Sequence, residues 1–145
     1  MSRLPLVLLL LATACGGGDG GGDSAPEPDR TRVSIGGVAL EVEVARTDEQ
    51  RRAGLRDREV PPGTGMAFPY EPAQRVRFTM SEVELPLVAV FSRAGRAVSV
   101  EQLEPCAGTV AQCPLYGPDE PVDLVVEAAP GSLPAARPGD PVVLG

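Results

Sequence analysis

Three short stretches in which apolar and polar residues alternate are the feature that most constrains the fold of this chain. Residues 38–44, 97–103 and 122–127 each place apolar side chains at about every second position. A period of two sends successive side chains to opposite faces of a β-strand. Each stretch therefore predicts a strand with one face on the core and one in solvent, and in the third stretch the solvent face carries Glu127.

Turn residues divide the rest of the chain into further short strands. Residues 87–91 are apolar throughout, which predicts a central strand covered on both faces. The turn at 93–96 returns the chain into 97–103 and predicts a β-hairpin. Other strands are expected at 66–70 and 75–80, after the turn cluster 61–65, and at 141–144.

Residues 47–54 predict one short helix. Thr47 and Gln50 have the spacing of a capping box, and Gly54 is placed to end the helix. A second helical turn is expected within 130–140. Many short strands with little helix predict an α+β, mainly β fold: a compact curled antiparallel sheet or barrel-like domain with one or two short helices.

The N-terminus has the pattern of an export signal. Arg3 precedes the apolar run 4–11, which is shorter than the roughly 20 residues that a membrane-spanning helix needs. The segment 11–15, LATAC, resembles the lipobox of bacterial lipoproteins, which implies lipidation of Cys15; an ordinary secretory signal cut near Ala14 is the alternative. We expect a signal peptide over 1–14, a flexible Gly-rich tether over 15–30 and a single domain over 31–145.

Two cysteines remain when Cys15 is set aside. Cys106 and Cys113 form an even pair, which in an oxidising compartment predicts a disulfide. Closing so short a loop stabilises the fold by roughly 2.5 kcal/mol on the chain-entropy estimate. A redox pair or a metal site are the functional alternatives, although two thiolates fall short of the four ligands of structural zinc.

The composition excludes several kinds of chemistry. Lysine, histidine, asparagine and tryptophan are absent, so no Ser–His or Cys–His pair, imidazole metal site or Schiff base is available. Removing Arg3 with the leader takes the formal net charge from −7 to −8, and no basic stripe is present. This charge argues against nucleic acid as a partner, and we expect no metal and no cofactor.

Several short motifs follow one another in this order: 42–47, 54–55, Arg58, 65–68, 78–80, 85–87, Gly95, 106–116, 125–127, Gly131 and 139–140. Their order resembles the family known as domain of unknown function 192, from about Val33 to Leu144. This family implies a compact, β-rich and frequently exported domain without an established reaction. Where the family has Trp-Met-Lys-Asn-Thr this chain has residues 79–83, TMSEV, and Val88 replaces the Asp that follows Leu. No activity is therefore carried over from the family.

Three charged residues are candidates for a ligand-binding site. Glu82 and Glu84 could serve as acid and base or hold a hard cation, or they could be solvated charges in a loop. Arg58 could hold a carboxylate or phosphate, or form a structural ion pair. Four apolar residues are expected in the core, with a small apolar pocket as the alternative: Met66, Phe68, Phe78 and Met80.

Together these features predict a non-enzymatic accessory lipoprotein that binds a protein or small ligand at the cell envelope. Its lipid on Cys15 would hold it on the cell membrane or outer membrane, with the domain facing the periplasm or exterior. One alternative is an enzyme built on Arg58, Glu82 and Glu84. Another is a degenerate family member with only a structural role, which predicts no concavity and no converging polar groups near Ser81, Glu82 and Val88.

Overall fold

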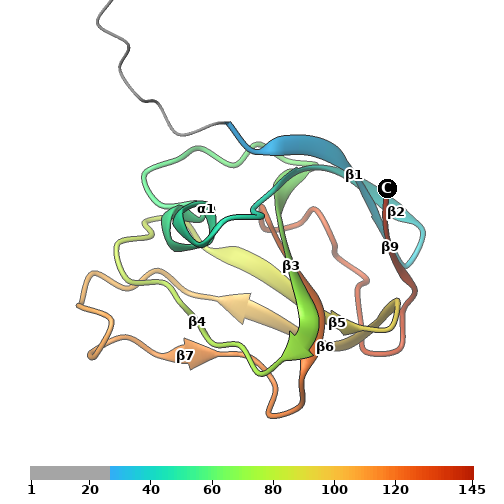
Figure 1. Cartoon of the computed structure of the whole chain (residues 1–145). Helices are drawn as coiled ribbons and strands as arrows, with labels where there is room; N and C mark the ends of the chain where they lie inside the picture. Colours follow the sequence, from blue (N-terminus) through green and yellow to red (C-terminus); the bar gives the residue numbers. More distant parts are fainter. Residues whose placement is uncertain (1–26) are drawn as a thin grey trace, which may run out of the picture.

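Seven strands form one curled sheet in the computed structural model, which describes residues 27–145 (Figure 1). The predicted leader, Cys15 and most of the tether lie outside the described residues. The order of strands across the sheet is β6-β5-β8-β3-β2-β1-β9, and neighbours are antiparallel except for the parallel pair β2–β3. A second, two-stranded sheet pairs β4 with β7. The elements are β1 (Asp29–Ile35), β2 (Val38–Val44), α1 (Asp48–Ala53), β3 (Thr64–Gln74), β4 (Phe78–Thr79), β5 (Leu87–Arg93), β6 (Arg96–Leu103), β7 (Leu115–Tyr116), β8 (Val122–Ala128) and β9 (Val142–Leu144).

Backbone hydrogen bonds join the two edges of the large sheet at one end. The amide of Ala97 donates to the carbonyl of Asp140 at 2.9 Å, and the amide of Val142 donates to Gly95 at 2.8 Å. These bonds connect the start of β6 to the segment that leads into β9, so the sheet curls into a partly closed barrel. The predicted class, α+β and mainly β, is confirmed.

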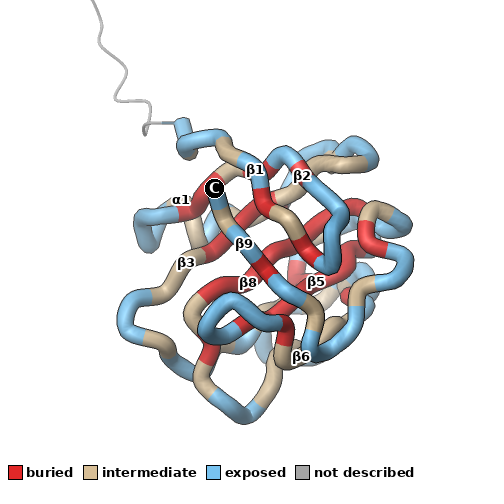
Figure 2. Tube along the Cα trace, turned by 90° about the vertical axis from the view of Figure 1, so that its right-hand side faces the viewer, coloured by how far each residue is buried: buried red, intermediate tan, exposed pale blue. Residues whose placement is uncertain are grey.

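The sheet has an apolar layer on each face. Inward-pointing side chains from all seven strands fill the barrel, and Figure 2 shows buried stretches running along β8, β5 and β3. On the outer face of β3, β8 and β5, a second cluster packs beneath α1 and the β4–β7 sheet, which lie on the same side of the barrel in Figure 1. Residues 87–92 of β5 are all buried because this strand serves both layers, as its apolar sequence predicted. The buried members of the outer cluster are Ala45, Leu55, Met66, Phe68, Met80, Leu87, Ala89, Phe91, Leu103, Val122 and Val125.

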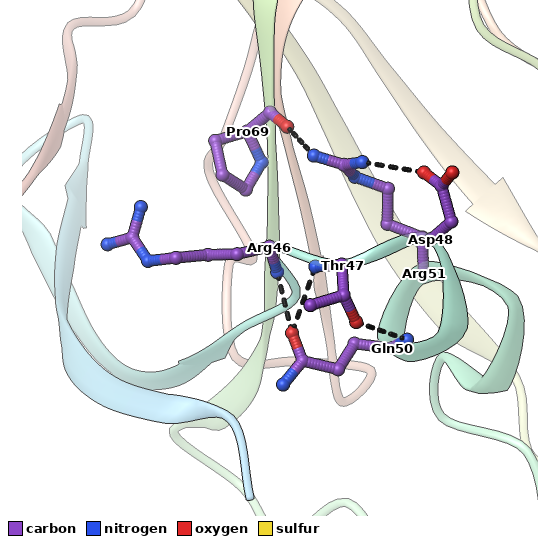
Figure 3. Close-up of polar contacts among 6 residues, drawn as sticks. All are labelled: Arg46, Thr47, Asp48, Gln50, Arg51 and Pro69. Atoms are coloured by element: carbon purple, nitrogen blue, oxygen red, sulfur yellow. Dashed lines mark hydrogen bonds and ion pairs between the residues drawn. The ribbon is translucent and has the colours of Figure 1, made fainter. Parts of the chain in front are cut away.

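Helix α1 has the predicted caps. The Thr47 hydroxyl accepts a hydrogen bond from the Gln50 amide at 3.1 Å, and the Gln50 side chain accepts from the Thr47 amide at 3.1 Å (Figure 3). Gly54, at a φ of 52°, ends the helix, and its amide donates to the Gln50 carbonyl. The capping box and the glycine thus fix both ends of a helix that has no buried residue of its own.

The structure corrects several expectations about the elements. Strand β1 was not predicted, and it starts the folded part at Asp29, within the stretch assigned to the tether. The strand predicted at 66–70 extends over Thr64–Gln74, whereas the one predicted at 75–80 is reduced to two residues. Residues 130–140 form turns, and α1 is the one helix of residues 27–145. No helix in the described part is long and apolar enough to span a membrane.

Candidate functional site

Glu127 lies in the middle of the outer face of the large sheet. In the strand register it is opposite Met66 of β3 and Ala89 of β5. The alternation of β8 predicted a solvent-facing side chain, and this prediction is wrong: Glu127 is only 5% exposed, because a second layer covers that face. Strand β3 passes so close that a Cβ on Gly65 would collide with the carbonyl oxygen of Glu127.

The Glu127 carboxyl has no partner in residues 27–145. No hydrogen bond or ion pair of its side chain occurs there, and burial raises its pKa to about 8. A carboxyl with that pKa is mostly protonated at neutral pH, so it is a neutral group that can donate one hydrogen bond. Its oxygens are not among the fully buried side-chain atoms that lack a hydrogen-bond partner in the described residues, so the carboxyl is reached from the pocket, where water or a ligand can accept its hydrogen bond.

An open pocket of about 510 Å³ lies over Glu127, and we name it the carboxyl pocket. Its volume falls within the range of roughly 300–1,000 Å³ that is usual for small-molecule sites. The apolar part of its lining includes two of the three phenylalanines of the chain, and Phe78 packs edge-to-face on Phe68 with ring centroids 5.0 Å apart. The lining residues are Arg51, Arg52, Ala53, Gly54, Leu55, Arg56, Phe68, Tyr70, Arg77, Phe78, Thr79, Met80, Ser81, Val83, Leu87, Val110 and Glu127.

Core and pocket are therefore not alternatives for the apolar residues identified in the sequence. Phe68 and Met80 belong to the outer cluster, Phe78 packs against it, and all three line the carboxyl pocket. Met66 belongs to the same cluster and does not line the pocket.

Arg51 fixes one wall of the pocket by tying α1 to β3. Its guanidinium donates to Asp48 at 3.1 Å and to the carbonyl oxygen of Pro69 at 3.0 Å (Figure 3), and it lies 5.2 Å from the ring centroid of Tyr70. Burial raises the pKa of Tyr70 to about 12, so its phenol stays protonated at neutral pH. These contacts hold the end of α1, and with it Arg52, at the edge of the pocket.

The disulfide loop forms another part of the pocket wall. Cys106 and Cys113 are bonded, as the sequence predicted. The Ser81 hydroxyl donates to the carbonyl of Gly108 at 2.8 Å, and Cys106 forms β-bridges with Ser81 and Val83. The bonded loop is thereby held against the turn after β4, and it places Val110 in the pocket lining with 59% of the residue exposed.

The charges of the lining are strongly asymmetric. Four arginines line the pocket, and Glu127 is the one acidic residue among its lining residues. The acids that pair with three of these arginines, Asp48, Glu82 and Asp119, are exposed and lie outside the lining. The local charge is thus positive in a chain whose formal net charge is −7.

The structure does not gather the three sequence candidates into one site. Arg58 forms a two-pronged ion pair with Glu43, with both nitrogen–oxygen distances at 2.8 Å, and this arginine holds the pKa of Glu43 below its ordinary value. Glu82 occupies a turn with a φ of 62° and pairs with Arg56 at 3.3 Å. Glu84 shares one open hollow with Arg58 and another with Glu82. No group of three or more potential metal ligands occurs among residues 27–145.

Glu127 was missed although its sequence context holds a signal. It is flanked by Val125 and Val126 on one side and by Ala128 and Ala129 on the other. A single carboxyl in an apolar run of this kind is a candidate for burial, because strands buried on both faces read as near-continuous apolar runs.

Comparisons with known proteins identify the family. The family model described as "Uncharacterized ACR", domain of unknown function 192, matches residues 31–144. A comparison with curated proteins finds no match to the sequence. Among solved structures, a Sinorhizobium meliloti 1021 protein described as a "putative transcription regulator" is 25% identical with a TM-score of 0.72, covering 83% of this chain and 98% of that one. A protein of unknown function from Novosphingobium aromaticivorans DSM 12444 is 24% identical with a TM-score of 0.69, covering 82% of this chain and 94% of that one, and supports the fold alone. The chain belongs to the domain of unknown function 192 family, whose function is not established.

Proposed function

We propose that this protein is an envelope lipoprotein whose domain binds a small, largely apolar ligand in the carboxyl pocket. The observation that carries the proposal is the unpaired, buried Glu127 side chain beneath an open pocket of ligand size. A neutral carboxyl there would donate a hydrogen bond to an acceptor on the ligand, while the aromatic side chains would contact its apolar body. Binding would replace water in the open pocket with a hydrogen-bond acceptor of the ligand at Glu127.

The pocket also bears on the two alternatives to a binding role. A purely structural family member predicts no concavity near Ser81, whereas Ser81 lines the carboxyl pocket together with Glu127. An acid–base enzyme is the second candidate, because a carboxyl with a pKa of about 8 can exchange protons near neutral pH. The lining supplies no histidine, cysteine or second carboxylate to share that work, so binding is the function that the geometry supports better.

Anchoring is proposed from the leader, with Cys15 as the lipidated residue and the Gly-rich tether as a spacer. The test is the intact mass of the membrane-extracted protein. A mass equal to residues 15–145 plus lipid would support the anchor, and an unlipidated mass would refute it.

Binding is tested with Nile red, a neutral apolar dye that carries a carbonyl acceptor and brightens in apolar surroundings. The full chain with Cys15→Ser cannot be lipidated, so no detergent would compete for the pocket. We expect saturable one-to-one binding that Val110→Asp weakens at least fivefold, because this change puts a hydrated charge in the pocket lining. The matched control is Val143→Asp, since Val143 is 62% exposed against 59% for Val110 and lines none of the pockets described. Equal effects of the two variants would refute a binding role for the pocket, and so would the absence of binding by Nile red and by smaller apolar probes alike.

A further inference from the structure

We infer that the ligand of the carboxyl pocket is an organic oxyanion with a short apolar body, whose negative group is held by Arg52 and Arg56. The inference rests on the proposed binding function and adds the chemical class of the ligand. The described lining of the pocket is asymmetric in charge: it contains four arginines, and its single acid is Glu127.

The four arginines differ in how far they are already engaged. Arg77 donates to the carbonyls of Val76 and Pro118 and pairs with Asp119 at 2.6 Å. Arg51 is held between Asp48 and Pro69 as described above. Backbone carbonyls as well as exposed acids hold both guanidinium groups, so turning either one toward a ligand would break bonds to the fold.

Arg52 and Arg56 are the available cations. Arg52 is exposed, and its guanidinium makes no hydrogen bond or ion pair with any residue that the structure describes. Arg56 has an ion pair with Glu82 at 3.3 Å, but the Glu82 side chain is 66% exposed, and such surface pairs are weak. The Arg56 guanidinium also donates a hydrogen bond to the Arg52 carbonyl at 3.4 Å, which keeps the two residues side by side.

The inner end of the pocket favours the same ligand class. Glu127 is the one acid that could attract a cationic ligand inward, and its burial disfavours the ionised form. A cation would also have to pass the arginines, whereas an oxyanion can accept paired hydrogen bonds from a guanidinium. The apolar body would then lie on Phe68, Phe78 and Met80, with its oxyanion at the arginines and a second acceptor at its inner end taking the hydrogen bond of Glu127.

The test compares three probes that share one apolar body: 4-phenylbutyrate, 4-phenylbutan-1-ol and 4-phenylbutylamine. Each is titrated at pH 7 into the isotope-labelled full chain with Cys15→Ser, and amide shifts give the dissociation constants. We expect the carboxylate to bind about tenfold more tightly than the amine, and the double variant Arg52→Gln/Arg56→Gln to remove about that factor while leaving the alcohol unchanged. The control variant Arg93→Gln/Arg96→Gln removes the same charge from the β5–β6 turn, outside the pocket lining, and should leave all three constants unchanged.

The experiment separates failure of the oxyanion inference from failure of the binding function. Equal or tighter binding of the amine, or no effect of the Arg52→Gln/Arg56→Gln change on the carboxylate, would overturn the oxyanion and leave the binding function standing. If neither Nile red nor any of the three probes shifts the residues of the pocket, the binding function itself is wrong.

Discussion

Replacing Glu127 by glutamine should make the stability of this protein less dependent on pH. Glutamine has nearly the same shape as glutamate and never ionises, so it removes one proton equilibrium while preserving the packing. In the folded protein burial raises the pKa of Glu127 to about 8, whereas the ordinary value, which applies to the unfolded chain, is 4.5. The folded state therefore keeps the proton over a pH range in which the unfolded state has lost it.

The sign and size of the effect follow from these two values. Below pH 4.5 both states are protonated, and Glu127 adds no pH dependence. From there to about pH 8 the unfolded state gains stability from ionising, so the free energy of unfolding falls by about 1.4 kcal/mol per pH unit. Between pH 5 and pH 8 the wild-type protein should lose about 3 to 4 kcal/mol from this group alone, and the Glu127→Gln variant should lose none of it.

Urea denaturation at pH 5, 6.5 and 8, at one ionic strength and without ligand, measures the difference between the two proteins. The Glu43 carboxyl, whose pKa Arg58 lowers, is present in both proteins and cancels in this difference. Glu120→Gln is the control, because Glu120 is exposed and the change removes one ionisable carboxyl there as well. If the stability difference between wild type and Glu127→Gln changes by less than about 1 kcal/mol across this range, Glu127 is not a buried neutral carboxyl.

Three further changes test the local structure by denaturant unfolding. Thr47→Ala should lower the free energy of unfolding by about 1 kcal/mol, because it removes the side-chain acceptor that caps α1. Thr47→Ser keeps that acceptor and should therefore retain most of this stability; equal losses in the two variants would argue against the cap. Arg58→Ala should cost about 1 kcal/mol because the Glu43 side chain, 13% exposed, loses its two-pronged partner and keeps the 3.1 Å pair with Arg30, and an unchanged midpoint would mean that Arg30 or water replaces the lost contacts. Changing Cys106 and Cys113 together to serine should cost about 2 kcal/mol, and wild-type thiols that react with iodoacetamide before reduction would contradict the disulfide.

Local sequence patterns were sufficient for the elements whose causes are local. The capping box at Thr47 and Gln50, the hairpin turn at 93–96 and the all-apolar strand at 87–91 each led to an element of the predicted kind. Each depends on contacts between residues close in the chain, or on a strand so apolar that any fold must bury it. Strand β1 was missed because its sequence, DRTRVSI, is mostly polar and is held in the sheet by pairing with β2 and β9.

The candidate site could be predicted only in part from local sequence patterns. Phe68, Phe78 and Met80 could be suggested as pocket residues because they are apolar and close in sequence. Glu127 could not be assigned to the same place, because it joins them only through the pairing of β8 with β3.

The sequence by itself determined the capped helix, the β5–β6 hairpin and the most apolar strand, which cysteines are available to pair, and which chemistry the missing histidine and lysine exclude. Only the tertiary structure decided that the sheet closes between β6 and the segment before β9, and that a second layer covers the outer face of β8. The physical reason is that alternation along a strand fixes which side chains share a face, whereas the cover on that face comes from segments distant in the chain. That cover turned Glu127 from an expected surface charge into the buried carboxyl on which the proposed function depends.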